Sequence, residues 1–291
     1  MSETDERTRS IARTHALGVL TNAGLAALKL VIGSLAGSRA LFADGLHSIS
    51  DVLMNGAAWL SWRWSERPRD ADHHYGHGNG EALATLTVGL IVVAVGLALV
   101  WSSVAGEPSS VGADLLGLLA VAAEAVTILV KLGLARVTTR AGARWRSSLL
   151  TALARDNRAD MLTSGLVLVA IVGTIAGLRW LEPLAAVAIG LLIGVEGLRS
   201  AWEGIGVLMD RHADPELDQA MRARASAVAG VLAVDDLRVH PLGTHLRIDM
   251  EIAVARSLDV AAGHAIAHAV EAALIEAYPQ VREVAVHVNP G

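Results

Sequence analysis

The chain has 291 residues, of which 53% are hydrophobic and 18% carry a charge, and its formal net charge is −5. Long windows with almost no charge indicate a polytopic membrane protein rather than a soluble one. The absence of cysteine excludes disulfides, thiolate metal ligands and cysteine nucleophiles, and the dispersed acidic excess offers no basic surface for nucleic acid.

The N-terminal tail, residues 1–14, is polar and lacks the basic start and short apolar core of a secretory signal peptide. A transmembrane domain, expected over 15–205, contains six apolar windows near 15–35, 40–61, 82–102, 113–134, 148–176 and 180–202.

The connecting segments differ in charge. Segment 62–80 carries three arginines and segment 131–147 carries Lys131 and four arginines, whereas 106–112 carries neither Lys nor Arg. The positive-inside rule therefore predicts that both basic segments and both termini lie in the cytoplasm, with the protein in the cell membrane.

The last part of the chain, residues 206–291, has the pattern of a small soluble domain. A helix over 215–230 is followed by strands over 235–243 and 244–255 that meet at a Pro-Gly turn. A second helix over 257–279, with Ser257 as the expected N-cap, precedes a strand over 281–290. The expected fold is a mainly α membrane protein, with six transmembrane helices and a cytoplasmic α+β (αββαβ) domain.

Two pairs of polar residues interrupt the apolar windows. His47 and Asp51 in LFADGLHSISD, and Asp156 and Asp160 in RDNRAD, are each four residues apart and so share a helix face. At 1.5 Å per residue, Asp51 and Asp156 lie about 15 Å from the cytoplasmic ends of their helices, and His47 and Asp160 about 21 Å. One imidazole and three carboxylates can hold a divalent cation tetrahedrally. The alternatives are polar helix packing and a proton relay.

Further charges lie within the predicted spans. Glu124 and Arg158 come out at similar depths, which predicts an ion pair between them; alternatively, each snorkels or faces a water-filled cavity. Lys29 is a third such charge, and Asp44 is expected near the outer end of its helix as a vestibule or helix-start residue.

Three motifs, ADGLHSISD, DNRAD and DADHHYGHGNGE, together resemble the cation diffusion facilitator family of divalent metal exporters. The resemblance implies a homodimer that exchanges a cytoplasmic divalent metal for protons, with transport ligands at His47, Asp51, Asp156 and Asp160. Asp156 stands where many zinc members carry histidine. Oxygen ligands favour Mn²⁺ or Fe²⁺, whereas His47 favours Zn²⁺, Co²⁺ or Ni²⁺, so the metal stays open.

The resemblance implies a loop metal site on Asp70, His73 and His77, with His74 adjacent; the alternative is a solvated polar loop. Asn79 stands where lysine is frequent, which puts the usual salt bridge toward the region of Asp210 in doubt.

In the cytoplasmic domain the resemblance implies a metal site that would tighten the dimer. His264 and His287 match this site, whereas Asp236 and Asp249 stand where histidine is common and Asn289 where aspartate is common. Other imidazoles are expected to be ordinary surface residues: His240, His245 and His268.

The expected function is therefore divalent metal and proton antiport across a lipid bilayer. No nucleophile elbow, P-loop or dinucleotide motif indicates an enzyme. Two alternatives are a non-transporting membrane metal sensor or scaffold, against which the four-ligand set argues, and a proton-coupled carrier of an organic solute, which should have interrupted helices.

Overall fold

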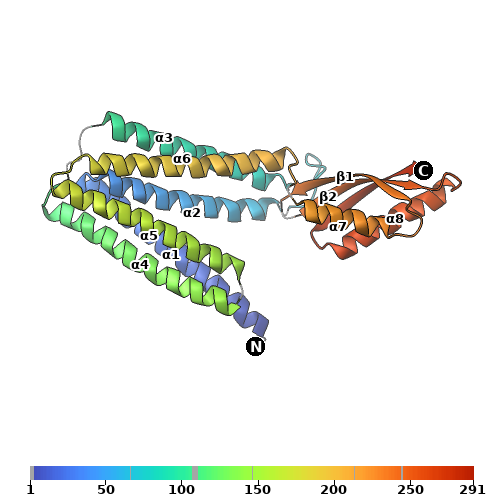
Figure 1. The fold of residues 1–291 in the computed structure, drawn as a ribbon, viewed down its shortest axis with the longest axis horizontal. Coiled ribbons are helices and arrows are strands. Elements are labelled where there is room, and N and C mark those ends of the chain that lie inside the picture. Colours follow the sequence, from blue (N-terminus) through green and yellow to red (C-terminus); the bar gives the residue numbers. More distant parts are fainter. Residues whose placement is uncertain (1–2, 66, 107–110, 146, 213, 244) are drawn as a thin grey trace. The chain divides into compact units, whose positions relative to one another are not determined.

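The computed structural model describes residues 3–65, 67–106, 111–145, 147–212, 214–243 and 245–291. Figure 1 shows long helices followed by a small mixed domain. The elements are α1 (Glu3–Ala36), α2 (Arg39–Ser65), α3 (Gly80–Ala105), α4 (Leu115–Trp145), α5 (Ser148–Ile175), α6 (Leu181–Leu208), α7 (Pro215–Ser226), β1 (Ala233–Leu242), β2 (His245–Val254), α8 (Val260–Ala277) and β3 (Val281–Pro290).

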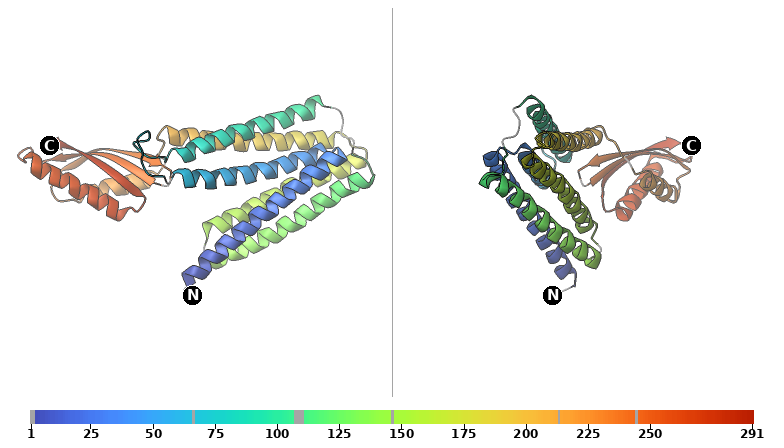
Figure 2. Two further views of the ribbon diagram at one scale, coloured as in Figure 1. Left: turned by 180° about the vertical axis from the view of Figure 1, so that it is seen from behind. Right: turned by 60° about the vertical axis from the view of Figure 1, so that its left-hand side comes forward.

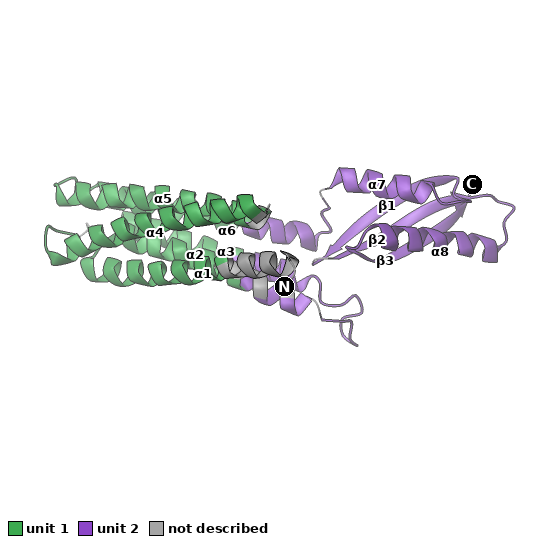
Figure 3. Cartoon of the chain, turned by 90° about the horizontal axis from the view of Figure 1, so that it is seen from below, with its two compact units in different colours: residues 1–56, 89–199 green, residues 57–88, 200–291 purple. Residues whose placement is uncertain are grey.

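The chain forms two compact units, which Figure 3 colours separately. Residues 1–56 and 89–199 make the first unit, and residues 57–88 and 200–291 make the second. The loop between α2 and α3 thus belongs to the same compact unit as the C-terminal domain. The domain ranges predicted from composition assign this loop to the transmembrane domain. Those ranges remain a prediction.

Hydropathy alone does not identify the membrane-spanning helices of this chain. Within the described ranges, α1, α3, α4, α5, α6 and α8 are long and apolar enough to cross a membrane. α8 meets this condition by composition only, because its apolar face packs on the sheet of the second unit. α2 misses it because His47, Asp51 and several serines lower its hydropathy. We therefore assign the six membrane helices to α1–α6.

The helices of the first unit pack closely. α4 lies along α5 and α1, as both views in Figure 2 show. α3 and α6 approach each other through glycines, since a Cβ on Gly96 would lie 2.6 Å from the Gly190 carbonyl oxygen. Small residues permit this approach in membrane helices, where van der Waals packing drives association.

Two segments are more helical than the sequence predicted. α1 begins at Glu3, so most of the expected N-terminal tail is helical. α4 continues to Trp145, so the expected basic segment 131–147 is mostly the end of a helix.

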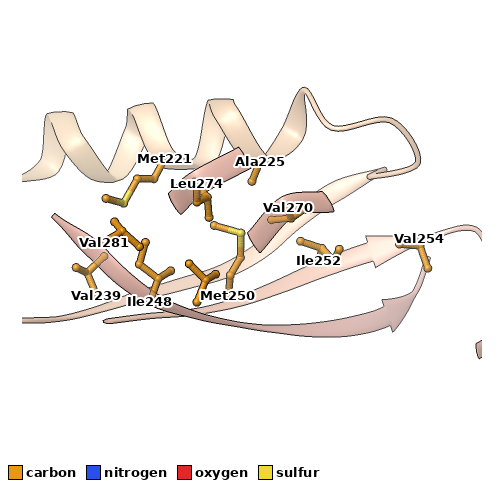
Figure 4. Close-up of a cluster of buried hydrophobic side chains, with 11 residues drawn as sticks. Met221, Ala225, Val239, Ile248, Met250, Ile252, Val254, Val270, Leu274 and Val281 are labelled. Atoms are coloured by element: carbon orange, nitrogen blue, oxygen red, sulfur yellow. The ribbon is translucent and has the colours of Figure 1, made fainter. Parts of the chain in front are cut away.

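The C-terminal elements follow the predicted αββαβ order. The sheet order is β1-β2-β3, with β1 antiparallel to β2 and β2 parallel to β3. α7 and α8 cover one face, where Met221 and Leu274 meet Ile248 and Met250 of β2 (Figure 4). The N-cap of α8 is Asp259, whose side chain accepts from the Ala262 amide, and not the predicted Ser257. Asp259 is the N-cap because α8 begins at Val260, so Asp259 directly precedes the first helical residue and Ser257 lies two residues too early.

Alternation along β2 leaves the opposite face of the sheet polar. Ile248, Met250 and Ile252 are buried beneath the helices, so the intervening residues Arg247, Asp249 and Glu251 point to the other side. We call this side the open face of the sheet.

Candidate metal centre

The polar residues of α2 lie on its buried side. His47 is 5% exposed and Asp44 is 1% exposed, so both polar side chains are buried among the helices of the membrane domain. Asp44, His47 and Asp51 follow one another at spacings of three and four, which places them along one face. That face is turned toward α1 and α5, because Asp44 bonds to both.

A three-residue group forms where α2 faces α5. His47, Asp51 and Asp160 each offer a ligand atom, and these atoms lie within 4.8 Å of one another. The Nε2 atom of His47 is 3.9 Å from Oδ1 of Asp160. An imidazole and two carboxylates at this separation are suitable ligands for a divalent transition metal. We call these three residues the buried triad.

Asp156, the fourth residue predicted from sequence, lies outside the buried triad. It is exposed, whereas Asn157, Asp160 and Ser164 form the inward stripe of α5. Four residues make slightly more than one helical turn, so a pair at this spacing diverges by about 40° around the axis. Here the divergence leaves Asp160 inside and Asp156 at the edge.

Lys131 belongs to the site, although the sequence did not predict it there. Its side chain is fully buried, it forms an ion pair with Asp160, and its ammonium donates to Oδ1 of Asn22 at 2.8 Å. The sequence predicts Lys131 in a basic loop, whereas it lies inside α4. The missed signal is its position seven residues after Glu124, which puts both on one face of α4.

A further acidic side chain, Glu196, approaches the buried triad from α6. Oε2 of Glu196 is 3.5 Å from Nδ1 of His47, on the side of the ring away from Asp160. The sequence did not predict Glu196 at the site either. It stands alone in an apolar stretch of α6, and Arg199, one turn later, makes a surface ion pair the simpler interpretation.

A second buried charged group lies on α1, α2, α4 and α5. The Lys29 ammonium is 2.6 Å from Oδ2 of Asp44 and 3.2 Å from Oγ of Ser164, which donates to the same Asp44 oxygen at 2.9 Å. Glu124 is completely buried near Lys29 and Asp44. We call Lys29, Asp44, Glu124 and Ser164 the lysine cluster.

The lysine cluster corrects two expectations. Asp44 is no vestibule residue, because it is the counter-ion of Lys29. Glu124 does not pair with Arg158, whose guanidinium instead donates to Oγ1 of Thr139 at 3.2 Å. Thr139 lies fifteen residues beyond Glu124, about 22 Å along the same helix. The depth estimate failed because α4 continues to Trp145, well beyond the predicted span 113–134, so Glu124 lies deeper than was estimated.

The predicted loop residues also come together. Oδ1 of Asp70 accepts from the His73 amide at 2.7 Å and lies 3.0 Å from His73 Nδ1, while Oδ2 is 3.3 Å from His77 Nε2. The hydrogen bond from the His73 side chain is the main cause that lowers the pKa of Asp70. Asp70, His73 and His77 form a second possible metal-holding group, the loop triad.

The loop triad is fixed to the C-terminal domain within the second unit. A Cβ on Gly78 would lie 2.7 Å from the Leu242 carbonyl carbon, so only glycine allows this approach. Arg69 bonds to Glu283 at 2.9 Å, and the Arg247 guanidinium lies 4.6 Å from the Tyr75 ring centre. Asn79 carries no charge and so cannot form the salt bridge toward Asp210 that a lysine would form. Instead, Oδ1 of Asp210 is 3.3 Å from Nδ1 of His240.

The predicted cytoplasmic site is only partly assembled in one protomer. Asp236, Asp249 and His287 line one concavity on the open face of the sheet. Arginines already pair with its acids, since Arg238 is 2.8 Å from Asp236 and Arg247 is 3.2 Å from Asp249.

His264, the fourth residue of that prediction, lies apart from the concavity on the exposed side of α8. There its Nε2 atom is 3.0 Å from Nε2 of His268. The reason is that the sheet lies between α8 and the open face, so the four residues do not form a shared site within one protomer.

Known proteins match nearly the whole chain. Residues 16–209 match the cation efflux transmembrane domain, and residues 213–291 match the cytoplasmic domain of cation efflux proteins. Metal tolerance protein 2 of Oryza sativa subsp. japonica is 33% identical over 95% of this chain and 78% of its own length. The manganese efflux system protein MneP of Bacillus subtilis is 28% identical over 99% of this chain and 98% of its own.

Among solved structures, the cadmium form of a MamM CTD variant aligns with 27% of this chain and 99% of its own, at 24% identity and a TM-score of 0.27. The two domain matches and the metal tolerance relative carry the assignment. The chain therefore belongs to the cation diffusion facilitator family of metal cation efflux proteins, and it carries both the transmembrane and the cytoplasmic domain of that family.

Proposed function

We propose that this protein exports a divalent transition metal from the cytoplasm in exchange for protons. The observation that carries the proposal is the buried triad, His47, Asp51 and Asp160, which gathers an imidazole and two carboxylates inside the membrane domain. Ionisable groups at such depth are expensive, and a divalent cation offsets this cost by neutralising the carboxylates.

Exchange follows from the chemistry of the ligands. Carboxylates and imidazole bind a metal only when deprotonated, so metal and protons compete for the same atoms. Asp156, one turn from Asp160 and more exposed, is proposed to complete the coordination when the cation arrives from the cytoplasm. Lys131 bonds to Asp160, so an incoming cation must share that carboxylate with the ammonium or displace it.

Manganese is the first metal to test. The proposed ligands are one nitrogen and three carboxylates, and hard oxygen ligands favour Mn²⁺ and Fe²⁺. The name of the Bacillus subtilis relative supports the same choice. Zn²⁺, Co²⁺ and Ni²⁺ are the competitors, because His47 is a good ligand for each of them.

The assembly is proposed to be a homodimer in the cell membrane with both termini in the cytoplasm. The match to the cytoplasmic domain of cation efflux proteins supports the dimer, and the basic residues after α2 and at the end of α4 support the orientation. The loop triad and the open face of the sheet then both lie on the cytoplasmic side, where they are proposed to bind regulatory metal.

A proteoliposome assay tests this function. Metal uptake is followed for Mn²⁺, Fe²⁺, Zn²⁺, Co²⁺ and Ni²⁺ while an internal dye reports pH. Wild-type protein should move Mn²⁺ and protons in opposite directions, and Asp51→Ala should abolish both fluxes while the protein keeps its elution profile as a folded dimer. Metal binding without flux in the wild type would instead favour the non-transporting sensor.

A further inference from the structure

We propose that Glu196 is the positioning residue of His47, holding the imidazole with Nδ1 toward α6 and Nε2 toward Asp160 and the bound metal. The inference rests on the proposed function, because it assigns a role at the same site. It goes beyond the four predicted ligands, since it adds a residue from α6, a helix that supplies none of them.

The first argument is geometric. Nδ1 of His47 is 3.5 Å from Oε2 of Glu196, and Nε2 on the other side of the ring is 3.9 Å from Oδ1 of Asp160. The ring therefore lies between two carboxylates, with one nitrogen facing each. A ring that donates Nδ1–H to Glu196 has its Nε2 lone pair free for the cation.

The second argument is burial. Among the described residues, neither Nδ1 of His47 nor Oε2 of Glu196 has a hydrogen-bond partner, and both atoms are inaccessible to solvent. An unpaired buried donor costs about 1–3 kcal/mol, so two complementary groups this close gain by pairing. A shift of a few tenths of an ångström brings 3.5 Å into the usual range for such a bond.

The third argument separates a positioning residue from a ligand. Glu196 is not part of the group whose ligand atoms lie within 4.8 Å of one another, although Asp51 and Asp160 both are. Histidine ligands of metals usually donate their other N–H to a carboxylate, which fixes the tautomer and the ring orientation. Glu196 occupies the place of that outer carboxylate.

Variants of the full-length protein in detergent test this role with Mn²⁺ and Co²⁺ as probes. Glu196→Ala should weaken metal binding about 10- to 100-fold. Glu196→Gln should weaken it about threefold or less, because the amide oxygen still accepts from Nδ1–H. Glu203→Ala, at an exposed position on the same helix, is the control and should bind as the wild type does.

Two readouts exclude a merely structural role. At saturating Co²⁺ the visible spectrum of Glu196→Ala should match the wild type, because the ligand set is unchanged. In a His47→Ala background, Glu196→Ala should cause no further loss, because it acts through the missing ring.

The inference is wrong if Glu196→Ala binds like the wild type, or if it changes the saturated Co²⁺ spectrum and weakens binding without His47, as a direct ligand would. If Glu196→Ala does not fold, Glu196→Gln in both backgrounds decides the question. Absence of any metal flux by the wild type would instead count against the proposed function, whichever way these binding experiments turn out.

Discussion

The buried triad and the lysine cluster are both made of charged residues on the inward faces of membrane helices, yet their charges balance differently. In the lysine cluster the chain supplies its own cation, Lys29, which bonds to Asp44 and Ser164. In the part of the chain that the structure describes, the buried triad has one lysine, Lys131, beside several carboxylates. Lys29 thus faces two carboxylates, Asp44 and Glu124, whereas the buried triad together with Glu196 sets three carboxylates against Lys131. The buried triad therefore has the larger excess of negative charge for a divalent cation to offset.

The largest expected effect separates the two groups on a single helix. Asp44→Asn should destabilise the protein by about 3–5 kcal/mol, because it leaves Lys29 buried without a counter-ion. Asp51→Asn, seven residues further along α2, should abolish transport with little loss of stability, because it removes one of several like charges. Thermal unfolding in detergent and metal flux measure the two outcomes.

The double variant Lys29→Met, Asp44→Asn is the control, and it should recover most of the lost stability because no unpaired charge remains. If Asp44→Asn were as stable as wild type but inactive, the lysine cluster would be part of the transport site and the comparison would fail.

The second effect concerns Lys131, the cation that forms an ion pair with Asp160. Lys131→Met should tighten Mn²⁺ binding by about tenfold, since it removes a positive charge that competes for Asp160. Titration calorimetry measures the dissociation constant, and Arg136→Met on the exposed side of α4 is the matched control. Weaker binding in Lys131→Met would mean that the lysine assembles the site rather than competing for it.

A third, smaller effect tests the edge position of Asp156. Asp156→Asn should raise the KM for transport on the order of tenfold, well short of the complete loss expected for Asp51→Asn. The reason is that Asp156 is exposed and outside the buried triad, so its contribution depends on a rearrangement. Equal losses in the two variants would show that all four ligands act together from the start.

The smallest effect extends the comparison to the exposed loop triad. His77→Ala should remove one bound metal per protomer while lowering transport only slightly, because the loop triad contains none of the proposed transport ligands. Elemental analysis of purified protein measures the stoichiometry, and His74→Ala, whose ring lies 3.1 Å from the Ala71 carbonyl oxygen, is the control.

Acid should release metal from the loop triad, because protons compete with a metal for its ligand atoms. The carboxylate of Asp70 stays ionised to a lower pH than an ordinary aspartate, because the hydrogen bond from the His73 side chain lowers its pKa. The stability contributed by this bond is present above the ordinary pKa of aspartate and is lost only as the pH falls through the lowered value. Metal retained at pH 5 would contradict this assignment.

The αββαβ order was predictable because alternation and periodicity are local properties of sequence, as in β2, where buried and polar residues alternate. Element ends were predicted less well. α4 runs to Trp145 because nothing in its sequence breaks the helix where the apolar window stops. The N-cap of α8 moved from Ser257 to Asp259, which depends on where the first turn begins.

The candidate sites divide in the same way. His47, Asp51 and Asp160 could be named from spacing and depth, whereas Asp70, His73 and His77 were named from the resemblance to the family. The pairing of charges could not be named, because it depends on which helices are neighbours. Depth alone suggested Arg158 for Glu124, whereas packing put Glu124 near Lys29 and left Arg158 with Thr139.

Sequence by itself determined that this chain places acidic and histidine side chains at costly positions inside a membrane domain, since hydropathy and spacing are readable along one dimension. Tertiary structure alone decided which of those charges are neutralised within the protein and which face a common point. Lys131 moved from an expected loop to the side of Asp160, and Glu196 emerged beside His47. The physical reason is that electrostatic energy depends on distances between helices, which the order of residues does not contain.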